Sequence, residues 1–134
     1  MANTMDKREV RVKGRKYCRE QLMSLGWDVT ELARNNKQGV DFIVHSKDGS
    51  HSVGIKVRTL SKHAAVGIGS SLDRVAGNFW VIVTEIATTP SAFVLPSQKV
   101  KELANRDSQY WLETRDYRQE KFREAWEQIG RGDV

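Results

Sequence analysis

"GVDFIVHSKDGSHSVGIKVRT", residues 39–59, alternates apolar and polar side chains on both sides of an Asp48-Gly49 pair. Such alternation indicates β-strands, because successive side chains of a strand point to opposite faces of the sheet. An Asp-Gly pair between two alternating runs favours a tight hairpin turn. The stretch therefore predicts a hairpin with strands at 40–46 and 51–58.

The turn sets the register of the two strands and places Asp41 beside Lys56. One face collects the apolar side chains Val40, Phe42, Val44, Val53, Ile55 and Val57. The other face collects Asp41, Ile43, His45, Ser52, Gly54, Lys56 and Arg58. A slip by one residue would bury the charges, so the pattern supports this register. The Asp41–Lys56 pair has two interpretations: a cross-strand ion pair that weakly stabilises the hairpin, or part of a functional site.

The remaining elements follow from hydrophobic periodicity and from Gly, Pro and capping signals. Strands are expected at 27–32, 78–85 and 91–95, and helices at 7–25, 70–77, 97–106 and 116–130. Ser97 is the expected N-cap of its helix, and "GIGSS" (67–71) is expected to be a turn. The order αβββαβ, followed by C-terminal helices, predicts an α/β sandwich with a mixed central sheet flanked by helices.

Length and composition limit the class of protein. A chain of 134 residues suits one domain over 1–134, with a loose tail at 1–6 and a helical C-terminal extension at 97–134. The single cysteine excludes an internal disulfide, and no apolar run is long enough to span a membrane. The N-terminus lacks the apolar stretch of a secretory signal. We therefore expect a cytoplasmic protein.

Positive charge is concentrated near the N-terminus. Lys7 to Arg19 holds seven basic residues and one acidic residue, within a chain of net charge +5. At helical spacing, four arginines form one stripe: Arg8, Arg11, Arg15 and Arg19. The stripe is either a solvated helix face or a surface that contacts phosphates.

Several segments together resemble the PD-(D/E)XK nuclease superfamily, and within it the archaeal Holliday-junction resolvases. They are "KGRKYCREQL" (13–22), "GWDV" (26–29), "GVDFIV" (39–44) and "GIKVRT" (54–59), in a similarity that spans roughly 12–85. The resemblance implies a restriction-endonuclease-like fold. It also implies a site with a helix glutamate, a strand aspartate and an Ile-Glu-Val-Lys strand. In that family the acids hold one or two divalent metal ions and the lysine stabilises charge in the transition state. Relatives of this fold often work as homodimers.

Carried onto this chain, the resemblance makes Asp41 and Lys56 the candidate catalytic residues and Asp41 the candidate metal ligand. The helix acid falls on Cys18, and the acid two positions before the lysine falls on Gly54. Mg²⁺ is usually held by carboxylates, and a thiol is a poor substitute for them. The sequence therefore predicts a degraded metal site at Cys18 and Gly54.

Three functions follow. The first is a nucleic-acid-binding protein, with DNA as the expected partner, on a nuclease-like fold. The second is an active Mg²⁺- or Mn²⁺-dependent endonuclease that recruits an acid from elsewhere, and the third is a protein-interaction module that has lost DNA contact. For the first, the expected phosphate-contacting residues are Arg8, Arg11, Arg15, Arg19, Arg58, Lys62 and Ser70.

Overall fold

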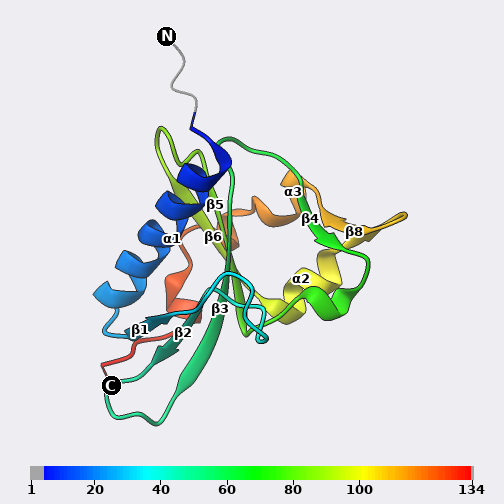
Figure 1. The fold of residues 1–134 in the computed structure, drawn as a ribbon. Coiled ribbons are helices and arrows are strands. Elements are labelled where there is room, and N and C mark those ends of the chain that lie inside the picture. Colours follow the sequence, from blue (N-terminus) through cyan, green and yellow to red (C-terminus); the bar gives the residue numbers. More distant parts are fainter. Residues whose placement is uncertain (1–4, 134) are drawn as a thin grey trace.

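The computed structural model describes residues 5–133 (Figure 1). The helices are α1 (Lys7–Ser24), α2 (Ser97–Leu103) and α3 (Thr114–Tyr117), and the 3₁₀ turns are η1 (Leu72–Arg74), η2 (Glu120–Phe122) and η3 (Trp126–Gln128). The strands are β1 (Asp28–Glu31), β2 (Phe42–His45), β3 (Ser52–Thr59), β4 (Val66–Gly69), β5 (Phe79–Thr84), β6 (Ser91–Pro96), β7 (Asn105–Arg106) and β8 (Tyr110–Leu112). Within residues 5–133, no helix is both long enough and apolar enough to cross a membrane.

The centre of the fold is a mixed five-stranded sheet in the order β1-β2-β3-β5-β6. Only β3 and β5 are parallel neighbours. The predicted hairpin register is confirmed, with Phe42 opposite Ile55 and Val44 opposite Val53. It holds because a slip would turn these apolar side chains out of the core. The predicted α/β class with a mixed sheet is therefore confirmed.

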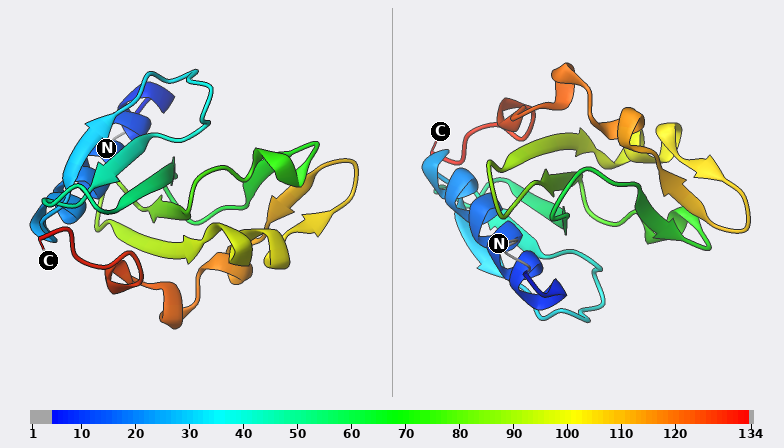
Figure 2. Two further views of the ribbon diagram at one scale, coloured as in Figure 1. Left: turned by 90° about the horizontal axis from the view of Figure 1, so that it is seen from below. Right: turned by 90° about the horizontal axis from the view of Figure 1, so that it is seen from above.

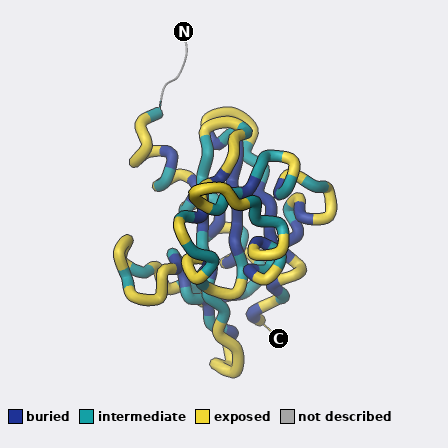
Figure 3. The backbone as a smooth tube through the Cα atoms, turned by 90° about the vertical axis from the view of Figure 1, so that its right-hand side faces the viewer, coloured by how far each residue is buried: buried dark blue, intermediate teal, exposed yellow. Residues whose placement is uncertain are grey.

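Two hydrophobic clusters lie on opposite faces of the sheet. Val81 and Val83 of β5 pack into the cluster that includes α1, whereas Trp80 and Ile82 pack into the cluster beneath β4, β8, α2 and α3. Figure 2 shows α1 with β1 and β2 at one end of the molecule, and β4 with the β7–β8 hairpin at the other. The central strands are buried and the connecting loops are exposed (Figure 3).

Helix α1 matches its predicted range closely. Its buried residues follow at steps of four: Val10, Gly14, Cys18 and Leu22. Asp6 is the N-cap and accepts the Glu9 N–H at 2.8 Å, while Met5 packs against the core. The prediction of a loose tail at 1–6 is therefore wrong for Met5 and Asp6, because capping and apolar contact order them. Residues 1–4 of that prediction lie outside the described range.

A second, three-stranded sheet in the order β4-β8-β7 was not predicted. Its strand β4 lies partly in the "GIGSS" stretch that was expected to be a turn, and β7 and β8 lie within the extension expected to be helical. Gly67 and Gly69 lower the local strand propensity of β4, which forms through pairing with distant β8. Residues 70–77, expected to be a short helix, contain the single turn η1.

The predicted helix at 116–130 is wrong. The chain there forms α3, η2 and η3, and runs along β6 through a bridge between Phe93 and Arg123. This pairing, and a positive φ of 47° at Glu124, interrupt the helix. The residues predicted to be buried are nevertheless buried: Phe122, Ala125, Trp126 and Ile129.

The predicted N-cap of the helix at 97–106 is also wrong. Pro96 occupies the cap position, Ser97 is the first helical residue, and its Oγ is buried without a hydrogen-bond partner in the described part of the chain. The helix itself forms as α2 but ends at Leu103.

Candidate nucleic-acid interface

Asp41 lies where the chain enters β2 and is fixed against β3 by hydrogen bonds. Its backbone N–H donates to the Ile55 carbonyl at 2.8 Å, and its Oδ2 accepts the Val57 N–H at 2.7 Å. The Asp41 carboxylate therefore accepts a hydrogen bond from the backbone of β3, at the point where the pairing of β2 with β3 ends. The Asp41 side chain is only 13% exposed.

Two cationic side chains lie within ion-pair distance of this carboxylate. The guanidinium of Arg15 lies 3.4 Å from Oδ1, and the ammonium of Lys56 lies 3.9 Å from Oδ2. The predicted pairing of Asp41 with Lys56 is confirmed. Burial lowers the pKa of the Arg58 guanidinium, and the negative charge of Asp41 acts in the opposite direction. Arg15 also lies 3.8 Å from Glu31, so Lys56, whose side chain is 31% exposed, is the neighbouring cation best able to attract an anion.

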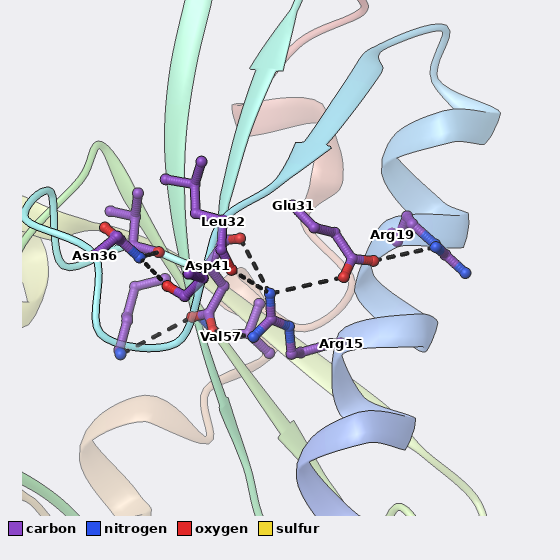
Figure 4. Close-up of polar contacts among 10 residues, drawn as sticks. Arg15, Arg19, Glu31, Leu32, Asn36, Asp41 and Val57 are labelled. Carbon is purple, nitrogen blue, oxygen red and sulfur yellow. Dashed lines mark hydrogen bonds and ion pairs between the residues drawn. The ribbon is translucent and has the colours of Figure 1, made fainter.

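The Arg15 side chain is mostly buried and contacts other parts of the protein. It donates to the carbonyls of Leu32 at 3.1 Å and of Asp41 at 3.3 Å, and its guanidinium lies 5.4 Å from the centre of the Phe42 ring. Figure 4 shows Arg15 between Asp41 and Glu31. These contacts join α1 to the start of β2.

The other three arginines of the predicted stripe differ in whether they form an ion pair. Arg19 forms a partly exposed ion pair with Glu31 of β1 at 3.1 Å (Figure 4). Arg8 is exposed and Arg11 is half-buried, and neither forms an ion pair with any residue in 5–133. Arg8 and Arg11 are therefore the stripe members available to a ligand.

Arg58 is anchored by the crossover between β3 and β5. Its Nη1 donates to the Gly67 carbonyl of β4 at 2.6 Å, and the guanidinium lies 5.9 Å from the Trp80 ring centre. Lys62 and Ser70, the other predicted contacts, are exposed but line neither of the two hollows described next.

Two adjoining hollows share Lys56 and Arg58. The first, of about 550 Å³, runs toward α1 and is lined by basic residues of three segments: Lys7, Arg11, Arg34, Lys56 and Arg58. The second, of about 360 Å³, runs toward η1 and is lined by Lys37, Lys56, Arg58 and Arg74. Together these hollows, here called the basic cleft, have seven basic and two acidic lining residues, the acids being Asp41 and Asp73.

The loop between β1 and β2 forms part of both walls of the cleft. Asn36 holds it: Nδ2 donates to the carbonyls of Ala33 and Val40, each at 2.7 Å, and Oδ1 accepts the Gly39 N–H at 2.8 Å. Lys37 follows Asn36 directly. Arg34, Lys37 and Arg74 were not predicted as contacts. They lie in loops and turns, where no repeating pattern in the sequence indicates which surface a side chain faces.

Cys18 is fully buried, as expected for a small apolar residue of α1. Burial raises the pKa of its thiol well above the usual value, and the nearby Asp41 charge raises it further. The thiol therefore stays neutral and is a poor ligand for a hard cation.

Gly54 lies away from the carboxylate of Asp41. The atoms nearest to a Cβ built on Gly54 belong to Gly77, Val40 and Asn78, at 3.4 to 3.7 Å. Its N–H donates to Oδ1 of Asn78 at 2.8 Å. Val40 was predicted to lie on the core face of the hairpin, but its side chain lies beside Gly54 on the other face. The alternation does not extend to Val40 because β2 begins only at Phe42.

The residues around Asp41 do not fit a divalent metal ion. Such an ion needs several oxygen ligands and negative charge. Asp41 lies beside the cations Arg15 and Lys56, and within residues 5–133 no group of three His, Cys, Asp or Glu side chains could hold a metal. The chemistry that this arrangement supports is binding of an anion.

Comparison with known proteins bears on the fold. No protein-family model matches the sequence, and no curated protein matches it. Among solved structures, a bacterial homing endonuclease is similar over 93% of both chains, with a TM-score of 0.63 and 16% identity. A Holliday junction resolvase from the archaeal hyperthermophile Archaeoglobus fulgidus is similar over 78% of this chain and 87% of its own, with a TM-score of 0.51 and 14% identity.

The chain has the restriction-endonuclease-like fold. The resemblance to the PD-(D/E)XK superfamily is thereby supported at the level of the fold. The basic cleft lies on a nuclease-like scaffold, with Asp41 at the start of one strand and Lys56 on the next.

Proposed function

We propose that this protein binds nucleic acid through the phosphate backbone, along the basic cleft, on a nuclease-like fold whose metal site is degraded. The observation that carries the proposal is the position of Lys56 and Arg58. They lie side by side at the junction of two hollows whose lining holds seven basic residues and two acidic ones.

The charge of the cleft matches the ligand. Lys and Arg that contact phosphates release counterions, which gives affinity without requiring base contacts. Rigid support favours such binding, and Arg58 is held by β4 while Asn36 holds the loop that carries Lys37. The two structural neighbours are an endonuclease and a junction resolvase, so DNA is the first partner to test. The proposal also includes a cytoplasmic location, and it is compatible with a homodimer.

The first experiment measures affinity for a labelled duplex and a labelled four-way DNA junction by fluorescence anisotropy over a series of salt concentrations. We expect affinity to fall steeply with salt, with a logarithmic slope of about −0.9 for each phosphate contact. Lys37→Ala and Arg74→Ala remove exposed cations from the cleft walls and should each weaken binding. Lys121→Ala removes the same charge from η2, against Phe122, and should leave affinity unchanged.

A cleavage assay with supercoiled plasmid and branched DNA, in Mg²⁺ or Mn²⁺, separates the alternatives. If the wild type nicks DNA and both Asp41→Ala and Lys56→Ala abolish the nicking, the protein is an active endonuclease and the proposal is wrong. Binding without nicking supports the proposal. If neither binding nor nicking occurs, the proposal fails and a protein-interaction module becomes the leading function.

A further inference from the structure

We infer that the ammonium of Lys56 occupies the place that a divalent cation would need beside Asp41, so that a phosphate binds there directly and a metal ion is excluded. The inference deepens the proposed function and rests on it for the identity of the anion, a nucleic-acid phosphodiester. The geometry around Asp41 carries it.

Each oxygen of the carboxylate faces a cation. Oδ2 accepts the Val57 N–H at 2.7 Å and faces the Lys56 ammonium at 3.9 Å, while Oδ1 faces the Arg15 guanidinium at 3.4 Å. A metal ion at either oxygen would be repelled by a neighbouring cation, and within residues 5–133 no group of three His, Cys, Asp or Glu side chains could complete its ligands. The positive charge that a metal would supply is built into the chain.

Lys56 keeps hydrogen-bonding capacity for a ligand. An ammonium has three donors, and only the side toward Asp41 faces an acid. The side chain is 31% exposed and lines both hollows of the basic cleft. Asp41 therefore positions the ammonium, and Arg58 lines the same two hollows. A phosphate bound there contacts both cations.

Position 56, and not position 54, is the one beside the aspartate. An acid at Gly54 would extend toward Val40 and Asn78, since these residues surround its Cβ position. Ile55-Lys56-Val57-Arg58 then corresponds to the Ile-Glu-Val-Lys strand of the nuclease resemblance, with a lysine in place of the acid. The inference therefore places the inverted charge at position 56, whereas the resemblance placed the lost acid at Gly54.

The test reverses that charge. Lys56→Glu places two carboxylates side by side, the arrangement that a divalent cation prefers. Mn²⁺ binding is measured by electron paramagnetic resonance on the full chain, and affinity for a labelled DNA duplex is measured in EDTA and in Mn²⁺ at constant ionic strength. The comparison proteins are wild type, Gly54→Glu, Lys56→Gln, and Lys56→Glu combined with Asp41→Asn.

We expect wild type to bind DNA equally in EDTA and in Mn²⁺, and to bind no Mn²⁺ alone. Lys56→Gln should weaken DNA binding and lower the salt slope by about 0.9, the loss of one phosphate contact. Lys56→Glu should gain Mn²⁺ binding, and Mn²⁺ should restore part of its DNA affinity. Neither gain should occur in Gly54→Glu or in the double variant.

Three outcomes would overturn the inference: Mn²⁺ binding by wild type, Mn²⁺ binding gained by Gly54→Glu, or no Mn²⁺ binding by a folded Lys56→Glu. Failure of the proposed function has a different signature. If wild type binds no DNA while Lys56→Glu gains Mn²⁺ binding that Asp41→Asn removes, the cation replacement stands and the nucleic-acid ligand is wrong.

Discussion

Gly14 of α1 lies directly against Thr59 of β3. A Cβ built on Gly14 would overlap Thr59 Oγ1 and lie 2.5 Å from the Thr59 Cβ. The absence of a side chain at this position lets α1 approach the end of β3, and that approach brings Arg15 to Asp41. The packing of one glycine therefore helps to position the charges of the cleft.

Gly14→Ala should destabilise the protein by about 1–3 kcal/mol, although alanine favours helix formation over glycine by about 1 kcal/mol. The reason is steric overlap with Thr59. Urea denaturation gives the free energy of unfolding. In a double-mutant cycle, Thr59→Gly should reduce the cost of Gly14→Ala, whereas Thr59→Ala should relieve less because it keeps the Cβ. Equal costs in all backgrounds would show that overlap with Thr59 is not what destabilises Gly14→Ala.

Substitutions at Arg15 and Arg11 should have different effects, the first on stability and the second on DNA binding. Arg15→Ala removes hydrogen bonds to two carbonyls and a cation beside Asp41, so we expect a loss of about 2–3 kcal/mol in the free energy of unfolding. Arg11→Ala should change stability by less than about 0.5 kcal/mol and weaken DNA binding.

Arg15→Lys serves as the control for charge alone. It keeps a cation but loses the planar guanidinium, whose Nη2 donates to both carbonyls while Nη1 faces Asp41 Oδ1, so it should not restore full stability. If Arg15→Ala is as stable as wild type, the contacts of Arg15 seen here do not hold α1 to β2.

Cys18 should resist thiol reagents in the native protein. It is fully buried, and burial together with the Asp41 charge raises its pKa, so little thiolate forms at neutral pH. It is the sole cysteine, so absorbance on reaction with Ellman's reagent reports this site alone. We expect slow reaction in buffer and rapid reaction in denaturant. Rapid reaction of the folded protein would contradict the buried position of this thiol.

Tyr17 links α1 to the C-terminal segment and should make stability fall at high pH. Its hydroxyl donates to Glu124 at 3.1 Å, and burial, followed by the Glu124 charge, raises its pKa from 10.0 to about 12. Between these values the unfolded chain loses a proton that the folded chain keeps. The contribution is therefore complete below pH 10 and is lost as pH rises through about 12.

Denaturation of wild type and Tyr17→Phe across this pH range measures the effect. We expect wild type to lose more stability than the variant. The pKa of Tyr117 is also raised by burial, but this residue is present in both proteins and cancels in the comparison. Parallel pH profiles would show that the Tyr17–Glu124 contact is not maintained.

Local patterns determined much of the main sheet. The hairpin of β2 and β3 was predicted with its register, because alternation and the Asp48-Gly49 turn act within a few residues. Helix α1 and strand β5 were predicted for the same reason. The burial of Phe122 and Trp126 was also predicted, although their backbone conformation was not.

The sequence by itself determined the fold class, the register of the hairpin and therefore the pairing of Asp41 with Lys56. Tertiary structure decided the remainder. Arg15 became an internal contact, and Arg34, Lys37 and Arg74 entered the cleft, because segments far apart in the chain pack together. Strands β4, β7 and β8 formed for the same reason. Alternation fixes which face a residue occupies, whereas the partner across a cleft depends on long-range packing that no short stretch encodes.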